Sequence, residues 1–289
     1  MNNYIKALFS VGFAILSAPS FGNVQTVETD NYKEVTNIIL QNDKRYSAEK
    51  TLLVFDIDNT LLTSGTRLGG DIWYQWQTGK LAIKPSAEEK VPCLYENAIT
   101  MLYELSPMQL TEPQLPKLMA QWQQKHTTFA LTSRAPDTEY ATLRELNRNG
   151  INFSTSSLTV KGEKMPLDER GKLKRSWRYT NGVFFSSGQD KGQILDFLLN
   201  KTGQQYDAII FVDDSISNIE AMKKMLASDK YAQVNSSIIH YTKVEADLIK
   251  KQGSVLNKQQ VQNLTKEWQS LAKALTTIYP DRSILCPVK

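Results

Sequence analysis

The segment TLLVFDIDNT, residues 51–60, gives the clearest indication of the fold of this chain. Its first half, residues 51–55, is a short continuous apolar run, which is typical of a β-strand buried on both faces. Polar residues follow the run without a gap, beginning with Asp56 and Asp58. Because the strands of an open parallel sheet present ligand-binding residues at their carboxyl ends, the stretch predicts a buried strand that delivers two carboxylates to a site.

Similar apolar runs recur downstream and alternate with helical patterns. Strands are expected at 129–131, 208–212 and 237–241, and helices at about 93–105, 112–125, 137–149, 191–202, 216–227 and 257–277. An apolar stripe through Val35, Ile38 and Ile39 predicts one more helix, capped by Asp30. Strands that alternate with helices indicate a parallel sheet covered on both faces. The fold class is therefore predicted to be α/β, a Rossmann-like doubly wound, mainly parallel sheet.

The composition is that of a folded protein of enzyme size. The chain has 289 residues, of which 41% are hydrophobic and 22% charged. Such a chain can bury a substantial core and is neither a disordered tail nor a fibrous repeat. The net charge of +4 is too small to require a nucleic acid, and no recognised nucleic-acid-binding module accompanies it. We therefore expect no nucleic-acid partner.

The first 22 residues have the pattern of a signal peptide. Lys6 precedes a mostly apolar run over residues 7–18, and small residues follow near a plausible cleavage point. A buried N-terminal helix is the alternative interpretation. The run is too short for a permanent membrane helix, and no later stretch has the required ~18 uninterrupted apolar residues. The sequence thus predicts an exported protein, periplasmic or secreted, without stable membrane insertion.

Cysteine usage leaves one question open. Only Cys93 and Cys286 are present, and an exported protein can join two such residues in a disulfide. A disulfide and two free thiols both remain possible, because the distance between the two Cα atoms decides. No CxxC pair occurs, which argues against structural zinc.

Polar side chains follow three of the predicted strands where each ends, and a lysine begins a predicted helix. They are Asp56 and Asp58, Thr132 and Ser133, Asp213 and Asp214, and Lys191. If the three strands are neighbours, four carboxylates meet at one rim and repel one another strongly unless a cation neutralises them. Oxygen-only ligands select a hard ion such as Mg²⁺. We therefore expect a divalent metal there.

The order of these residues resembles the haloacid dehalogenase superfamily, the Rossmann-like phosphohydrolases. Residues 56–60, Asp-Ile-Asp-Asn-Thr, match its first motif, DxDxT. Thr132 matches the second motif, Lys191 the third, and residues 212–215 with Asn218 the fourth. The resemblance covers roughly residues 50–242 of the chain. Within the superfamily, the run DIWYQW after the first motif looks similar to an uncharacterised exported bacterial branch.

The resemblance implies a role for each residue. Asp56 would attack phosphorus to form an aspartyl phosphate. Asp58 would protonate the leaving oxygen and later activate water. The residues that hold the phosphoryl group would be Thr132, Ser133 and Lys191. The Mg²⁺ ligands would be Asp56, the main-chain carbonyl of Asp58, Asp214, and Asp213 either directly or through water.

These roles predict a Mg²⁺-dependent phosphomonoester hydrolase that acts on a phosphorylated small molecule or a phosphoprotein. Asp58 favours this activity, because dehalogenases and phosphonate hydrolases of this fold lack a carboxylate at that position. Two alternatives stay open. A phosphotransferase would pass the phosphoryl group from Asp56 to an alcohol, and a catalytically silent binding or effector protein would keep only the fold.

The segment between the first two motifs is too long for a simple loop. We expect residues 66–126 to form a mostly helical cap, inserted into a core made of residues 23–65 and 127–289. The aromatic residues of the DIWYQW run would either pack inside this cap or line a substrate entrance.

A second range, residues 151–185, is rich in cations. It is expected to be a solvated loop or a second small insertion. In the latter case its lysines and arginines would attract a phosphorylated substrate.

Overall fold

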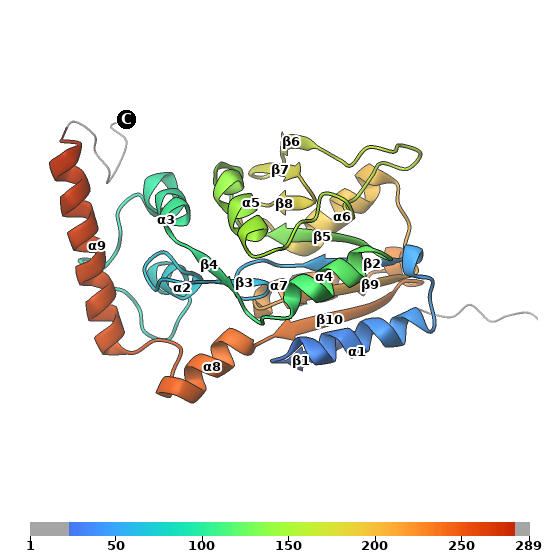
Figure 1. Cartoon of the computed structure of the whole chain (residues 1–289), viewed down its shortest axis with the longest axis horizontal. Helices are drawn as coiled ribbons and strands as arrows, with labels where there is room; N and C mark the ends of the chain where they lie inside the picture. Colours follow the sequence, from blue (N-terminus) through green and yellow to red (C-terminus); the bar gives the residue numbers. More distant parts are fainter. Residues whose placement is uncertain (1–22, 281–289) are drawn as a thin grey trace, which may run out of the picture.

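A central sheet organises the molecule. The computed structural model describes residues 23–280, and its main sheet has eight strands in the order β1-β10-β9-β2-β5-β8-β7-β6 (Figure 1). Their bounds are β1 Val24–Thr29, β10 Asn235–Tyr241, β9 Ala208–Asp213, β2 Thr51–Phe55, β5 Thr127–Thr132, β8 Val183–Phe185, β7 Ser176–Thr180 and β6 Glu169–Lys172. All pairs from β1 to β8 are parallel, whereas β7 and β6 are antiparallel to their neighbours. The predicted Rossmann-like α/β class is confirmed.

Helices cover both faces of this sheet because its central strand is apolar on both. Leu53 and Phe55 of β2 pack in one hydrophobic cluster, with helices α1 Tyr32–Asp43, α4 Leu115–Gln123 and α5 Glu139–Arg148. Leu52 and Val54 face the opposite side and pack with helices α6 Lys191–Thr202 and α7 Ile216–Leu226. The alternation of side chains along a strand therefore divides one continuous apolar run between two cores.

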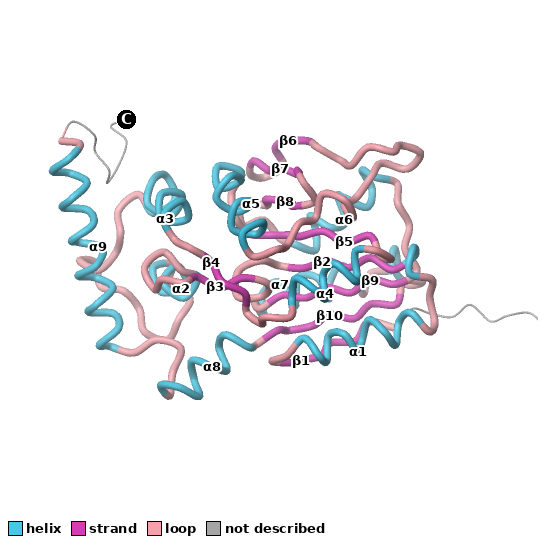
Figure 2. The backbone as a smooth tube through the Cα atoms, viewed as in Figure 1, coloured by secondary structure: helices cyan, strands magenta, loops and turns pink. Residues whose placement is uncertain are grey.

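A separate helical layer lies beyond the carboxyl ends of the strands (Figure 2). It contains α2 Asp71–Gln77, the π-helical turn Leu94–Ala98, α3 Ile99–Leu105 and α9 Lys258–Ile278. We call this layer the cap. The short strands β3 Leu62–Ser64 and β4 Met108–Leu110 pair antiparallel and connect it to the sheet. Helix α8 Lys243–Gln252 leads from β10 towards α9.

The cap has its own hydrophobic core. Trp73 and Trp76 are each only 1% exposed and belong to a third cluster with residues of α3 and α9. The ring centroids of Trp73 and Trp268 are 6.4 Å apart. Of the two roles expected for the DIWYQW aromatics, these tryptophans take the packing role, whereas Tyr74 lines a cavity described below.

The packing differs from the predicted division of the chain in two places. Helix α4 lies within the predicted cap range 66–126, but its residues Leu115, Met119 and Trp122 pack against the sheet. Helix α9 lies outside that range and packs with the cap through Val261, Leu264 and Trp268. An amphipathic helix shows in its sequence that one face is buried, but not which partner buries it.

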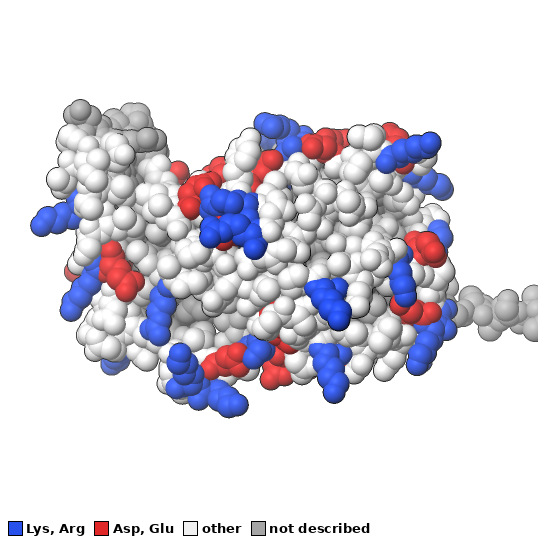
Figure 3. Space-filling view, in the orientation of Figure 1, with Lys and Arg blue, Asp and Glu red and all other residues white. Residues whose placement is uncertain are grey.

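The cation-rich range 151–185 contributes strands to the main sheet. It contains β6, β7 and β8, and β8 pairs directly with β5. A solvated loop or a separate small insertion was expected here, whereas residues of this range extend the main sheet. On the face drawn in Figure 3, basic and acidic side chains are interspersed, so that this face shows no extended region of one sign.

Two predictions fall partly or wholly outside the described residues. The signal peptide over residues 1–22 is one of them, so that nothing in the structure bears on it. Cys93 is disulfide-bonded, while Cys286, the only other cysteine of the sequence, also lies outside the described range. Within residues 23–280, no helix has the length and apolarity needed to span a membrane.

Candidate active site

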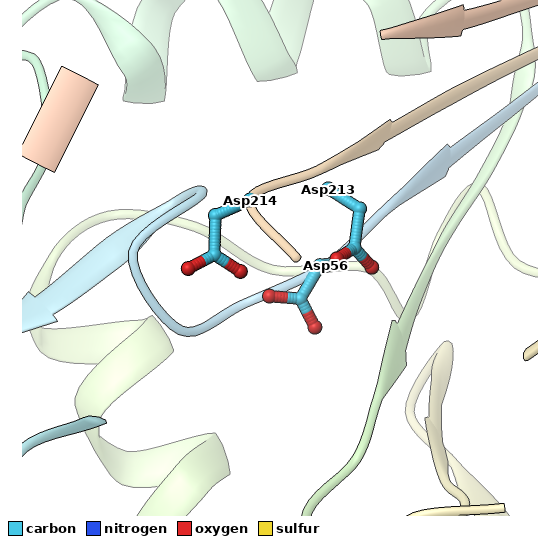
Figure 4. Close-up of side chains that lie close together, drawn as sticks. All are labelled: Asp56, Asp213 and Asp214. Atoms are coloured by element: carbon cyan, nitrogen blue, oxygen red, sulfur yellow. The ribbon is translucent and has the colours of Figure 1, made fainter. Parts of the chain in front are cut away.

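Three carboxylates converge at the carboxyl ends of two adjacent strands. β2 pairs with β9, Asp56 follows β2, and Asp213 and Asp214 stand at the end of β9. Each of the three offers an oxygen within 4.8 Å of the others, and Figure 4 shows the carboxylates turned toward one another. The neighbouring positions of β2 and β9 thus bring together residues more than 150 positions apart in the chain.

Lys191 contacts this cluster and links two of its members. Its side chain is fully buried, and Nζ donates hydrogen bonds to Asp56 Oδ1 at 2.5 Å and to Asp213 Oδ2 at 2.7 Å. Burial alone would lower the pKa of Lys191, but the charges of Asp213 and Asp56 raise it above its ordinary value. The ammonium is therefore held in its charged form between two carboxylates.

Local sequence explains how Lys191 reaches this position. It is the first residue of α6, and the side chain of Asp190 caps the helix by accepting a hydrogen bond from the Gln193 N–H at 2.9 Å. The next residue, Gly192, lets α6 approach α7 closely, because a Cβ there would lie 2.4 Å from the Ala221 carbonyl oxygen. The glycine therefore permits close helix packing next to Lys191, whose side chain reaches Asp56 and Asp213.

Asp213 is oriented by three donors. Besides the Lys191 bond to Oδ2, its Oδ1 accepts from the Ser215 N–H and from Asn218 Nδ2, both at 2.9 Å. Asn218 matched the fourth motif without a clear role in the sequence. In the structure its amide fixes the carboxylate of Asp213.

Asp58 forms an ion pair that the sequence did not predict. Arg134 donates from Nε to Asp58 Oδ2 at 2.8 Å and from Nη2 to Oδ1 at 2.7 Å. Arg134 follows Thr132 and Ser133 in the chain, so its position at the end of β5 could be predicted from the sequence. Its ion pair with Asp58, 76 residues away, could not be predicted.

The two residues predicted beside Arg134 lie in different environments. Thr132 is fully buried, and its hydroxyl accepts a hydrogen bond from the Arg134 N–H at 3.1 Å. Ser133 lines the cavity in front of the carboxylates, whereas Thr132 is not among the lining residues. A direct contact with a substrate is therefore easier for Ser133 than for Thr132.

The cavity lies between the sheet and the cap and has a volume of about 950 Å³. Its sheet side includes Asp56, Asp58 and Asp214, and its cap side includes Tyr74, Tyr95 and Tyr103. The volume is far larger than a phosphate ion and lies within the range of ligand pockets of proteins. The carboxylates are thus open to a molecule of substantial size.

A further carboxyl group enters this cavity from the cap. Asp71 is the first residue of α2, and its Oδ2 accepts hydrogen bonds from Asn59 Nδ2 at 2.9 Å and Gln75 Nε2 at 2.5 Å. Burial raises the pKa of Asp71 to about 6, and the nearby charge of Asp58 adds to the rise. This role could not be predicted from the sequence, because it depends on how the cap is placed on the sheet.

Asp71→Asn is expected to stabilise the protein at neutral pH. The folded-state pKa of about 6 lies above the ordinary value of 3.8, so this carboxyl favours the folded state in acid and loses that contribution as the pH rises from about 4 to 6. The isosteric amide should raise the free energy of unfolding at about pH 7.5 by roughly 1–3 kcal/mol. Urea unfolding in a chelating buffer at two pH values measures this, and a variant less stable than wild type at neutral pH would contradict it.

The electrostatics of the cluster suit a divalent cation. Burial raises the pKa of Asp56 to about 8, with Lys191 opposing the rise and Asp213 adding to it. Burial also raises the pKa of Asp214 well above its usual range, and Asp71 and Asp56 add to that rise. One ammonium thus leaves excess negative charge among oxygen ligands, and a hard cation such as Mg²⁺ would remove it. The residues present therefore fit a magnesium ion.

The sequence of this chain matches that of one known protein family. A family model described as "Protein of unknown function (DUF2608)" matches residues 28–278. The chain belongs to this family. The match to DUF2608 runs from the last two residues of β1 to the end of α9, so it includes the other seven strands of the main sheet and the whole cap.

The names of two other relatives indicate only a cellular location. A protein of Chlamydia pneumoniae named "Putative outer membrane protein" is 27% identical over 65% of this DUF2608 chain and 69% of its own length. A protein of the same name from Chlamydia trachomatis serovar D is 25% identical over 68% of this chain and 69% of its own length.

Two solved structures are similar to this chain only at low sequence identity and low TM-score. A haloacid dehalogenase family enzyme of Bacteroides thetaiotaomicron, a magnesium complex, has a TM-score of 0.35 and 10% identity, covering 65% of this chain and 92% of that one. A haloacid dehalogenase-like protein of Streptococcus pneumoniae has a TM-score of 0.34 and 12% identity, covering 70% of this chain and 97% of that one.

Proposed function

We propose that this protein is a Mg²⁺-dependent phosphomonoesterase of the haloacid dehalogenase type that works through an aspartyl phosphate. The observation that carries the proposal is Lys191, buried and bonded to both Asp56 and Asp213 beside Asp214. Burying an ammonium between carboxylates is costly and is most simply explained by a catalytic need for all of them. The order of residues along the chain, from DxDxT to the aspartate pair, is the order of the motifs described above.

Asp56, Asp58 and Lys191 each have a chemical role in this reaction. A carboxylate oxygen of Asp56 forms a bond to phosphorus, and the ester P–O bond breaks with its electron pair going to the leaving oxygen. Asp58 gives that oxygen a proton, and in the second half it takes one from the water that hydrolyses the aspartyl phosphate. Lys191 keeps Asp56 in place and stabilises charge on the group being transferred.

The metal would be held by the carboxylates of the cluster. Asp213 already accepts three hydrogen bonds, so Asp56 and Asp214 have more free lone pairs for a cation, together with the main-chain carbonyl of Asp58. When bound, Mg²⁺ supplies positive charge that offsets the carboxylates and the phosphoryl oxygens.

We also propose a class of substrate and a location for the protein. The cavity of about 950 Å³ accommodates a phosphorylated small molecule, and a phosphorylated side chain of a protein is the other candidate. Export to the periplasm or beyond is supported by the N-terminal pattern of the sequence and by the names of the chlamydial relatives.

Removal of divalent ions is expected to abolish phosphatase activity. Turnover of a panel of nucleotides, sugar phosphates, phosphoinositides and phosphopeptides, measured with Mg²⁺ and with EDTA, tests this. We expect EDTA to lower the rate of the best substrate by about 100-fold or more, because the carboxylate cluster then repels the phosphoryl group. Excess Mg²⁺ should restore the rate. Full activity in a metal-free buffer would contradict the proposal, and transfer of phosphate to added alcohols would identify the phosphotransferase alternative.

A further inference from the structure

Asp58 is fixed in orientation by a single guanidinium. Arg134 binds its two carboxylate oxygens through separate N–H groups, at 2.8 and 2.7 Å. Two parallel hydrogen bonds of this kind set the plane of a carboxylate, whereas one bond leaves it free to turn. Both partners line the cavity that contains Asp56, so the fixed group lies where a substrate would be.

Arg134 is itself held from two sides. It is 5% exposed, and its Nη1 donates to the Thr142 hydroxyl of α5 at 2.9 Å. The ring of Tyr103 covers the guanidinium, with its centroid 4.0 Å from Cζ. Tyr103 belongs to α3 in the cap, whereas Thr142 belongs to α5, which packs against the main sheet. One side chain therefore connects the cap to Asp58.

We propose that Arg134 is a positioning residue that aims Asp58 at the leaving oxygen, and that Tyr103 of the cap keeps Arg134 in that orientation. The inference rests on the proposed function, because it concerns the proton that Asp58 gives when the ester P–O bond breaks. As that proton leaves, negative charge grows on Asp58, and a guanidinium in contact with both oxygens stabilises it. A cap seated over the substrate would thereby also align the acid.

The dependence on the leaving group distinguishes this role from a structural one. Phenoxide is a poorer leaving group than 4-nitrophenoxide and needs its proton more in the transition state, although the two esters have nearly the same shape. A defect in proton donation therefore slows phenyl phosphate more than 4-nitrophenyl phosphate. A general loosening of the site slows both equally. The ratio kcat/KM is the proper measure, because it covers the steps up to the first irreversible one and omits later hydrolysis.

The main variant is Arg134→Lys, which keeps the charge and loses the two-pronged geometry. We expect kcat/KM for phenyl phosphate to fall about 10-fold more than kcat/KM for 4-nitrophenyl phosphate. Tyr103→Leu, which removes the ring, should show the same pattern more weakly, whereas Tyr103→Phe, which retains the ring, should leave the ratio of the kcat/KM values for the two esters unchanged. Arg144→Lys is the matched control, since Arg144 also links α5 to α3, through Glu104, but is absent from the cavity lining.

The possible outcomes distinguish a failure of the positioning role from a failure of the proposed function. An equal loss on both esters in Arg134→Lys, or no loss at all, overturns the positioning role while the phosphatase stands. A wild-type protein that turns over neither ester, nor any phosphomonoester of the panel, overturns the proposed function and this inference with it. A Tyr103→Leu variant with unchanged rates on both esters overturns the part assigned to the cap.

Discussion

Asp56→Asn is expected to lower kcat by at least about 10³-fold, because an amide oxygen cannot replace the carboxylate that attacks phosphorus. Asn has nearly the shape of Asp and can still accept the hydrogen bond from Lys191, so the fold should persist. The measurement is turnover of 4-nitrophenyl phosphate at saturating Mg²⁺. Circular dichroism confirms that the variant is folded.

A matched control lies just before strand β9, at the end of the sheet away from the carboxylates. Asp207 precedes β9 at the end opposite to Asp213, is exposed, and is not among the lining residues of the cavity. Asp207→Asn should keep wild-type turnover. If Asp56→Asn retained a tenth of the wild-type rate, the nucleophile would be a different residue.

Lys191→Met is expected to destabilise the protein by about 3–5 kcal/mol, because it leaves Asp56 and Asp213 buried without their shared counter-charge. The side chain of Lys191 is 0% exposed, so solvent cannot replace the lost ion pairs. Urea unfolding in EDTA gives the free energy of unfolding without a contribution from bound metal. We also expect phosphatase activity to disappear, because Lys191 holds the attacking carboxylate.

Lys201, on the same helix, provides the comparison for this loss. Its side chain is 28% exposed and pairs with Glu169 at 2.6 Å. Such a surface pair is worth little, so Lys201→Met should cost less than about 1 kcal/mol. Equal effects of the two substitutions would show that burial of the Lys191 cluster has no special energetic role.

The parts of the fold that could be predicted are those fixed by local pattern. β2 has the predicted bounds. A mostly apolar run of only five residues is too short for a typical helix and favours a buried strand. Helix α6 begins and ends as expected, with Asp190 as its cap and Gly203 at φ 65° as its terminator. The helix expected after Asp30 starts one residue later, since the capping side chain is that of Asn31.

The parts that could not be predicted depend on long-range packing. Strand β6 reads Glu-Arg-Gly-Lys and has no apolar run, and it is a strand only because β7 pairs with it. The place of α9 in the cap depends on the tryptophans of α2, nearly 200 residues away in the chain.

The same distinction holds for the candidate site. Asp56, Lys191 and Asp214 could be named from the sequence, because each stands at the end of an element whose pattern is clear. Arg134 and Asp71 could not, because their importance lies in the partners that the sheet order and the cap give them. Sequence motifs thus locate the carboxylates, and the structure adds what orients them.

In the proposed mechanism, Asp56 carries the phosphoryl group during the reaction. The most direct measurement is mass spectrometry of the Asp56 peptide after acid quenching during turnover and reduction with borohydride, which converts an aspartyl phosphate into homoserine. We predict homoserine at position 56 in the presence of substrate and Mg²⁺, and none in the presence of EDTA. Steady turnover with an unmodified Asp56, or with the modification on another residue, would contradict the account.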